Sequence, residues 1–213
     1  MRLVLFDLDN TLADRAEGFR RWAWEFCAEH RLGDEDAEWL VAADRDGLEP
    51  REAFFTAVRE RFALHESVPQ LLEDFHERHP ALIPMAPGVR GGLPRLRAAG
   101  WRIGVVTNGD AAQQLATLVC TGLAGMVDGW AISAHEGVGK PDRRLFEIAA
   151  GRCEVPLKGG WMVGDSAAAD ITGGRAAGLR TVWVDRGRRW PEDDGAPDHV
   201  VGDAAGAIEL LLR

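Results

Sequence analysis

The feature that most constrains this chain is a short apolar run near its start that ends in two closely spaced acids. Residues 3–6 are Leu, Val, Leu and Phe, and Asp7 and Asp9 follow them. A continuous apolar run of this length is typical of a strand buried on both faces of a parallel sheet. Because carboxylates are costly to bury, Asp7 and Asp9 are expected where the strand ends and the backbone opens to solvent. In an open parallel sheet, ligands bind at that carboxyl edge.

The spacing of the two acids indicates the chemistry of the site. Alternate residues of an extended chain face the same side, so the side chains of Asp7 and Asp9 can lie together. Two carboxylates at that spacing repel each other unless a cation or a proton separates their charges. The pair therefore predicts a hard-cation site that also performs acid–base chemistry.

The rest of the chain alternates between predicted strands and helices, with one long helical interruption. Up to about residue 83, apolar residues recur with helical spacing, and four helices are expected, at residues 16–30 and starting near residues 34, 50 and 67. Beyond residue 87, helices alternate with strands predicted at residues 102–106, 129–133, 160–163, 181–184 and 199–201. Strands that alternate with helices are typical of a right-handed, doubly wound parallel sheet.

We therefore predict an α/β fold, in which a doubly wound, parallel, Rossmann-like sheet core carries an inserted four-helix domain. Residues 1–13 and 84–213 are expected to form the core, and residues 14–83 the helical insertion. Residues 14–80 hold 17 acids and 9 bases, which predicts a solvated acidic face or a surface that repels polyanionic substrates.

The composition restricts the partners and the location that we expect. A net charge of −9 argues against nonspecific binding to nucleic acid. No apolar run approaches the roughly 20 residues that a membrane-spanning helix needs, and the first residues lack a signal-peptide pattern. The three cysteines show no paired spacing, as is usual in a reducing compartment. The prediction is a cytoplasmic monomer or homodimer without nucleic-acid or membrane partners.

Polar residues follow the predicted strands at three places, and one loop adds a lysine. Because the carboxyl ends of parallel strands meet at one edge, these residues are expected to converge despite their separation in sequence. They are Asp7 and Asp9, Thr107 and Asn108, Asp165, and the loop residue Lys140. Carboxylates with Mg²⁺, a lysine, a hydroxyl and backbone N–H groups suit a phosphoryl group, since the cations screen its repulsion from a carboxylate.

These segments, in this order, resemble the motifs of the haloacid dehalogenase-like superfamily over the whole chain. The matching stretches are Asp7-Leu8-Asp9-Asn10-Thr11-Leu12, Val106-Thr107-Asn108-Gly109, Lys140-Pro141, and Gly164-Asp165 with Asp170 five residues on. The resemblance implies that Asp7 is the nucleophile and forms an aspartyl-phosphate. It implies that Asp9 acts as the general acid and base, and that Lys140 steadies Asp7 and the phosphate.

The resemblance also implies a substrate site and a metal site. Thr107, Asn108 and Gly109 would bind the phosphoryl group. Mg²⁺ would be held by Asp7, the backbone carbonyl of Asp9, and Asp165. The family often has Asn-Asp at the end of its last motif, whereas this chain has Ala169-Asp170. We therefore expect Asp170 to support the ligands from outside and not to bind the ion itself.

The expected function is Mg²⁺-dependent hydrolysis of a small-molecule phosphate monoester. The acid at Asp9 favours phosphate esters within the family, because the halide released by dehalogenating members needs no proton. Two alternatives share the motifs: a phosphotransferase or phosphomutase, and a hydrolase of a non-phosphate substrate in the manner of the haloacid dehalogenases. A binding protein without turnover is a third alternative.

The helical insertion resembles the family's cap, which closes over the site and excludes water. Four arginines in it are candidates for substrate contact, although solvated helix charges explain such residues more simply. They are Arg15, Arg20, Arg45 and Arg51. His76 and His79 share a helix face, and because no metal-binding pattern accompanies them we expect both at the surface.

Overall fold

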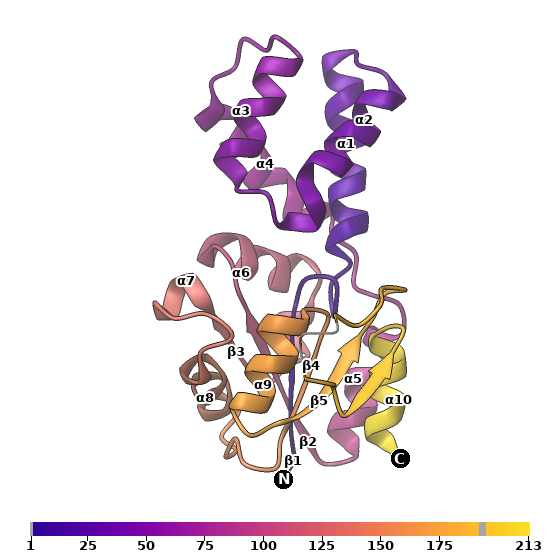
Figure 1. The fold of residues 1–213 in the computed structure, drawn as a ribbon, viewed down its shortest axis with the longest axis vertical. Coiled ribbons are helices and arrows are strands. Elements are labelled where there is room, and N and C mark those ends of the chain that lie inside the picture. Colours follow the sequence, from indigo (N-terminus) through magenta and orange to yellow (C-terminus); the bar gives the residue numbers. More distant parts are fainter. Residues whose placement is uncertain (1, 192–194) are drawn as a thin grey trace. The chain divides into compact units, whose positions relative to one another are not determined.

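The computed structural model describes residues 2–191 and 195–213, and the chain divides into two compact units (Figure 1). One unit consists of Met1–Asp14 with Met85–Arg213, and the other of Arg15–Pro84. The first unit contains the sheet and the second is helical. The second unit is thus an insertion near the start of the first.

Six parallel strands form the sheet of the first unit, in the order β3-β2-β1-β4-β5-β6. They are β1 (Arg2–Phe6), β2 (Trp101–Thr107), β3 (Gly129–Ile132), β4 (Trp161–Gly164), β5 (Arg180–Val184) and β6 (His199–Val201). Each predicted strand is present and agrees to within one residue at either end. The predicted α/β, doubly wound parallel fold is confirmed.

Strand β1 is central, with β2 on one side and β4 on the other, which explains its uninterrupted apolar sequence. Phe6 is in register with Val105 of β2 and Val163 of β4. The strand order reverses beside β1, and such a switch point opens a crevice at the carboxyl ends of the strands. The backbone N–H of Asp7 donates to the carbonyl of Val163 at 2.8 Å, so the residue that follows β1 is fixed against β4.

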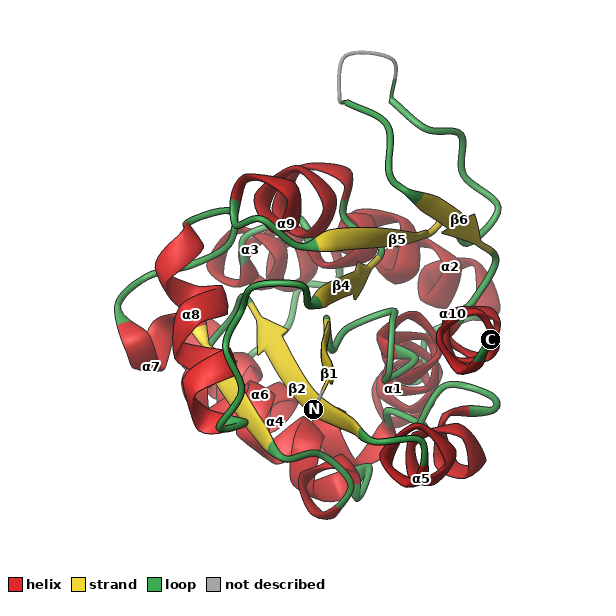
Figure 2. Ribbon diagram, turned by 90° about the horizontal axis from the view of Figure 1, so that it is seen from below, coloured by secondary structure: helices red, strands yellow, loops and turns green. Residues whose placement is uncertain are grey.

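Helices cover both faces of the sheet (Figure 2). On one face α5 (Val89–Ala98) packs against α10 (Ala204–Leu212), and on the other lie α8 (Arg143–Arg152) and the short α9 (Gly173–Ala176). Leu5 and Val106 of the strands pack in one buried cluster with Leu145 and Phe146 of α8. The remaining helical segments of this unit are α6 (Ala111–Cys120), η2 (Leu123–Gly125), α7 (Ser133–Glu136) and the π-helix η3 (Ala167–Thr172).

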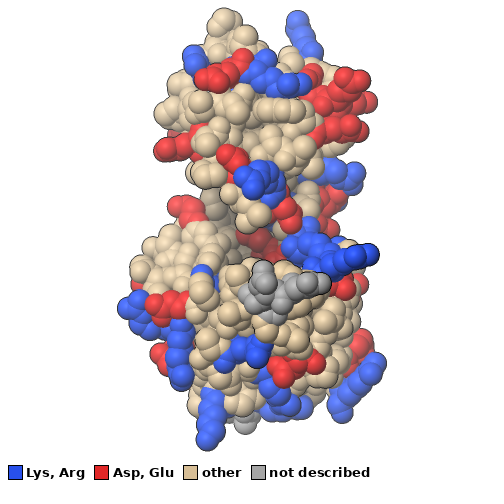
Figure 3. Space-filling view, in the orientation of Figure 1, with Lys and Arg blue, Asp and Glu red and all other residues tan. Residues whose placement is uncertain are grey.

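The helical unit contains the four predicted helices and one additional turn. They are α1 (Arg15–His30), α2 (Asp34–Asp44), the 3₁₀ turn η1 (Arg45–Gly47), α3 (Arg51–Arg61) and α4 (Val68–Leu82). Their inward faces meet in an aromatic core, in which the rings of Trp22 and Phe75 lie 4.9 Å apart, edge to face. In Figure 3, acidic side chains gather over α2, whose first turn holds Asp34, Glu35 and Asp36. The acid excess of this segment thus lies at least partly on a solvated face.

The buried side of this unit also holds charged groups. Arg15 donates to both carboxylate oxygens of Asp44, at 2.8 and 2.9 Å, and Arg51 adds a third contact at 2.5 Å. Burial alone would raise the pKa of Asp44, but the two guanidinium groups outweigh it and hold that pKa below its usual value. Arg20 and Arg45 are exposed beside Glu17 and Glu49, so the interpretation as solvated helix charges fits them. Arg15 is buried, so that interpretation does not fit it.

The prediction that His79 lies at the surface is wrong. Only 5% of this residue is exposed, and its ring stacks on Phe75 with the centroids 4.4 Å apart. Leu71, Phe75 and His79 are spaced four residues apart on α4, so His79 shares the buried stripe of the helix. Burial and the charges of Arg15 and Arg51 lower the pKa of His79 to about 3, and its imidazole is neutral.

The chain enters and leaves the helical unit at neighbouring points of the first unit. Ala13 forms an isolated antiparallel bridge with Met85, and the N–H of Ala86 donates to the carbonyl of Leu12 at 2.9 Å. The two crossings are therefore fixed together by backbone hydrogen bonds.

None of the helices in residues 2–191 and 195–213 combines the length and apolar character needed to cross a bilayer.

Candidate active site

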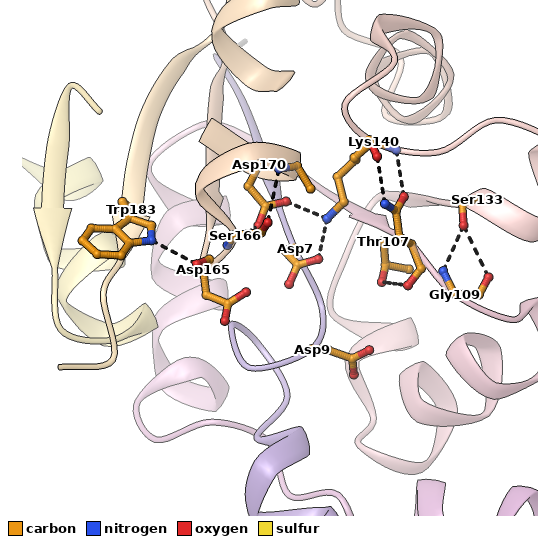
Figure 4. A network of polar contacts seen from close by, with 12 residues as sticks. Asp7, Asp9, Thr107, Gly109, Ser133, Lys140, Asp165, Ser166, Asp170 and Trp183 are labelled. Atoms are coloured by element: carbon orange, nitrogen blue, oxygen red, sulfur yellow. Dashed lines mark hydrogen bonds and ion pairs between the residues drawn. The ribbon is translucent and has the colours of Figure 1, made fainter. Parts of the chain in front are cut away.

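Residues from four separated segments meet at the carboxyl edge of the sheet (Figure 4). Asp7 directly follows β1, Thr107 ends β2, and Asp165 directly follows β4. Lys140 comes from the loop between α7 and α8. The predicted convergence of these residues follows from the parallel sheet, because every strand ends at the same edge.

Lys140 connects two of the acids. Its Nζ lies 2.5 Å from Oδ1 of Asp7 and 2.7 Å from Oδ1 of Asp170, and only 7% of the residue is exposed. Burial alone would lower the pKa of Lys140, but the charges of Asp170 and Asp7 outweigh that effect and raise it above its usual value. The lysine is therefore a fixed cation between two buried carboxylates.

The acids at this edge carry more negative charge than the lysine offsets. Asp7, Asp165 and Asp170 each offer an oxygen atom within 4.8 Å of the others. Burial, together with the charges of Asp170 and Asp165, raises the pKa of Asp7 well above its usual value, although Lys140 opposes the shift. Burial and the charge of Asp170 raise the pKa of Asp165 to about 6, although Arg188 and Arg186 oppose it.

Such a donor set fits a metal ion. Carboxylate oxygens are the ligands that hard divalent cations prefer, and two of these three carboxylates belong to buried residues. A cation there would offset the burial and the mutual repulsion that together raise the pKa values of Asp7 and Asp165. Asp165 is also contacted by two guanidinium groups, from Arg186 at 3.1 Å and Arg188 at 3.0 Å. The cluster could therefore hold a metal ion.

Asp170, which is expected to support the ligands, contacts Lys140 directly. It is completely buried, and besides Lys140 it accepts a 2.9 Å hydrogen bond from the backbone N–H of Ser166. The carboxylate packs directly on Gly164, where an added Cβ would meet Asp170 Oδ2 at 2.2 Å. The π-helix η3 contributes this residue, and such single-turn elements are frequent at functional sites.

The loop that carries Lys140 is clamped to the end of β2. The side-chain amide of Asn108 donates to the carbonyl of Lys140 at 2.9 Å and accepts from its N–H at 2.8 Å. The next residue, Gly109, donates its N–H to Ser133 Oγ at 2.9 Å. Asn108 thus fixes the position of the lysine. The binding of substrate by Asn108 and Gly109 stays a prediction.

Sequence reasoning missed Gln114, which contacts three of the predicted site residues. Its Nε2 lies 2.8 Å from Asp9 Oδ2, 2.9 Å from Thr107 Oγ1 and 2.9 Å from the carbonyl of Asn108. Gln114 is buried on the inward face of α6, four residues before Leu118. A polar residue within the apolar stripe of a helix was the available signal.

A buried carboxylate–lysine centre at the switch point of a doubly wound sheet defines an α/β enzyme. The family model for haloacid dehalogenase-like hydrolases matches residues 1–178. The chain is 33% identical over 239 residues to phosphoserine phosphatase from Thermus thermophilus, across 95% of this chain and 96% of that protein. It is 29% identical over 197 residues to glyceraldehyde 3-phosphate phosphatase from Pyrococcus abyssi, across 88% of this chain and 83% of that protein.

A solved structure has the same fold. The magnesium-bound HAD-hydrolase YfnB from Bacillus subtilis matches with a TM-score of 0.77 and 22% identity, across 99% of this chain and 98% of that one. This chain belongs to the haloacid dehalogenase-like hydrolase family. It is an enzyme of the hydrolase class, and the two relatives just named are phosphatases.

Proposed function

We propose that this hydrolase is a phosphatase that cleaves a small-molecule phosphate monoester through an aspartyl-phosphate on Asp7. The observation that carries the proposal is the position of Asp7 at the end of the central strand, held by Lys140 beside two further carboxylates. The relatives act on small phosphorylated metabolites, as their names state, and this supports the same substrate class here.

The proposed reaction has two steps. A carboxylate oxygen of Asp7 attacks phosphorus, the bond from phosphorus to the ester oxygen breaks, and Asp9 gives its proton to that oxygen, so that the alcohol leaves. Asp9 then takes a proton from water as the water oxygen attacks phosphorus. The bond from phosphorus to Asp7 breaks, its electron pair returns to the carboxylate, and inorganic phosphate is released.

The cationic side of the site would make this attack possible, since a carboxylate and a phosphate dianion repel each other. Lys140 supplies one fixed positive charge, and the hydroxyl of Thr107 would donate to a phosphoryl oxygen. We propose Mg²⁺ as the metal, held by the carboxylates of Asp7 and Asp165 and the backbone carbonyl of Asp9, with Asp170 supporting Lys140. Such an ion supplies further positive charge to the transferring group.

The helical unit completes the proposal. We propose that residues 14–83 are the cap of the core formed by residues 1–13 and 84–213, and that it excludes water during turnover. The division of the chain into two compact units, with boundaries after Asp14 and after Pro84, supports this assignment. A cytoplasmic location and a monomeric or homodimeric state remain predictions from the composition.

Asp9 favours this proposal over a dehalogenase-like reaction. The carboxylate lies beside Thr107, to which it is connected through Gln114. A proton donor at this position benefits an ester, whose leaving oxygen needs a proton. A phosphotransferase would use the same residues, and is distinguished by its product when a sugar acceptor replaces water.

The test is phosphate release from a panel of phosphorylated metabolites and aryl phosphates, with and without EDTA. We expect Mg²⁺-dependent release of inorganic phosphate by the wild-type protein and none by Asp7→Asn. Asp34→Asn, which changes an exposed acid of α2, is the matched control and should retain full activity. Full activity of Asp7→Asn would refute the assignment of the nucleophile. Transfer to a sugar without free phosphate would identify a phosphotransferase.

A further inference from the structure

One buried amide nitrogen connects the predicted general acid with the predicted phosphate-binding hydroxyl. Gln114 Nε2 lies 2.8 Å from Asp9 Oδ2 and 2.9 Å from Thr107 Oγ1. A third acceptor, the backbone carbonyl of Asn108, lies 2.9 Å away. Only 5% of Gln114 is exposed, so its contacts are made within the protein.

The orientation of this amide follows from its partners. A backbone carbonyl can only accept a hydrogen bond, and so can a carboxylate oxygen that carries no proton, so the side-chain atom that faces Asn108 and Asp9 must be a donor. The Gln114 nitrogen satisfies both, and the reversed amide would place its oxygen against two further acceptors. The Nε2 therefore donates toward Asp9.

This bond determines which oxygen of Asp9 is free to carry a proton. Because Oδ2 accepts from Gln114, the proton that Asp9 donates in the proposed reaction belongs on Oδ1. We propose that Gln114 is a positioning residue for general acid catalysis, which holds Asp9 with Oδ1 as its proton-donating oxygen. The inference rests on the proposed phosphatase function.

Gln114 Nε2 has two hydrogens for three acceptors, so Thr107 Oγ1 shares one of them in a three-centre bond. Since Thr107 Oγ1 accepts from Nε2, its own hydrogen is available as a donor. The hydroxyl donates to the carbonyl of Asn108 at 3.4 Å, a long contact that a phosphoryl oxygen would replace.

The positioning role of Gln114 predicts that the rate lost on its removal depends on the leaving group of the ester. In the first step the phosphorus–oxygen bond breaks as the Asp9 Oδ1 proton passes to the leaving oxygen. An alkoxide is a poor leaving group and needs that proton, whereas 4-nitrophenolate leaves without it. Loss of Gln114 should therefore slow the cleavage of alkyl phosphates far more than that of 4-nitrophenyl phosphate.

The experiment compares kcat/KM for an alkyl phosphate and for 4-nitrophenyl phosphate, because kcat/KM covers binding and the first transfer and excludes the shared water step. For Gln114→Met we expect a loss of about 100-fold with the alkyl ester and less than about 10-fold with the aryl ester. Gln114→Glu keeps the size of the side chain and replaces the donor, and should show the same pattern. Gln113→Met, one residue earlier on α6, is the control and should leave both values near wild type.

Asp9→Asn provides the reference for a lost acid. Because Gln114 is proposed to act through Asp9, the double variant Gln114→Met/Asp9→Asn should be no worse on the alkyl ester than Asp9→Asn alone. Equal losses on both esters in folded Gln114 variants, or additive losses in the double variant, would overturn the positioning role. Failure of the wild-type protein to hydrolyse either ester would instead reject the phosphatase function.

Discussion

Lys140 Nζ lies 2.5 Å from Asp7 Oδ1, although 133 positions separate the two residues in the chain. The contact depends on two constraints that act on different segments. β1 delivers Asp7 to the edge of the sheet, and the amide of Asn108 holds the loop from which Lys140 extends. The lysine then meets Asp170 as well, so that one buried cation is shared by two buried carboxylates.

Removal of this cation should affect both activity and stability. Lys140→Met leaves Asp7 and Asp170 buried without the positive charge between them, and breaking a buried ion pair from one side typically costs about 3–5 kcal/mol. We expect a loss of that order in the free energy of unfolding, measured by urea denaturation, and at least about 100-fold lower kcat/KM. Lys158→Met removes the other lysine, which is exposed, and should change neither the free energy of unfolding nor kcat/KM. Wild-type activity in Lys140→Met would contradict the role of the lysine.

A divalent ion should stabilise the folded protein. Any ligand that binds only the folded state at about 100 times its Kd adds roughly 2.7 kcal/mol to the free energy of unfolding. We expect Mg²⁺ to raise the melting temperature of the wild-type protein and EDTA to reverse the increase. Asp165→Asn should abolish the shift, whereas Asp34→Asn should retain it. An equal shift in Asp165→Asn would place the ion elsewhere.

The packing of Asp170 on Gly164 gives a steric prediction. Gly164 is the last residue of β4, and a Cβ added to it would lie 2.2 Å from Asp170 Oδ2. We expect Gly164→Ala to lower the free energy of unfolding by about 1–3 kcal/mol and to reduce turnover, since Asp170 must move away from Lys140.

Gly151→Ala is the matched control for this prediction. It lies in α8 with open space around the added methyl group, and should stabilise the protein by up to about 1 kcal/mol, because alanine is the better helix former. Chemical denaturation of both variants checks the pair, and equal effects of the two substitutions would contradict the steric argument.

The buried imidazole of His79 should make stability depend on pH. Its pKa in the folded state is about 3, while an unfolded chain protonates histidine near its usual value of roughly 6.5. Above that value neither state binds the proton. As the pH falls below it, the unfolded state is favoured by up to about 1.4 kcal/mol per pH unit until the folded state also titrates.

The measurement is urea denaturation of the wild-type protein and of His79→Phe at pH 7 and pH 5. The wild-type protein should lose about 2 kcal/mol more than the variant between the two values. His65→Gln changes an exposed histidine and should follow the wild-type protein. An identical pH dependence in wild type and His79→Phe would contradict this prediction, since it would show that the imidazole takes up its proton at the same pH in both states.

The part of this molecule that sequence predicts well is the part determined by short-range pattern. The apolar run before Asp7 and the alternation of strands and helices predict the parallel sheet, and a parallel sheet brings Asp7, Thr107 and Asp165 to one edge. His79 was also predictable, since it continues the four-residue spacing of Leu71 and Phe75. The lack of a metal-binding pattern, on which the surface prediction was based, says nothing about burial.

Several contacts could not be read from the sequence, because they depend on tertiary packing. Asp44 is the buried acid of the helical unit, and Arg15, which it binds, is 29 positions away. Gln114 contacts Asp9 across 105 positions. Asp170 lies in a π-helix, whose geometry departs from the helical period used to assign inward faces. In each case a polar side chain in an apolar setting is visible in the sequence, but its partner is not.

The bridge between Ala13 and Met85 has a consequence for the architecture as a whole. Ala13 and Met85 already lie side by side where the chain enters and leaves the helical unit. A short glycine–serine linker between them would therefore close the gap left by removing the intervening helices. The strand order of the sheet would be unaffected, since all six strands lie outside the excised segment. The same junction could accept an unrelated helical module, and under the proposed function such an exchange would alter substrate choice while leaving the phosphate chemistry in place.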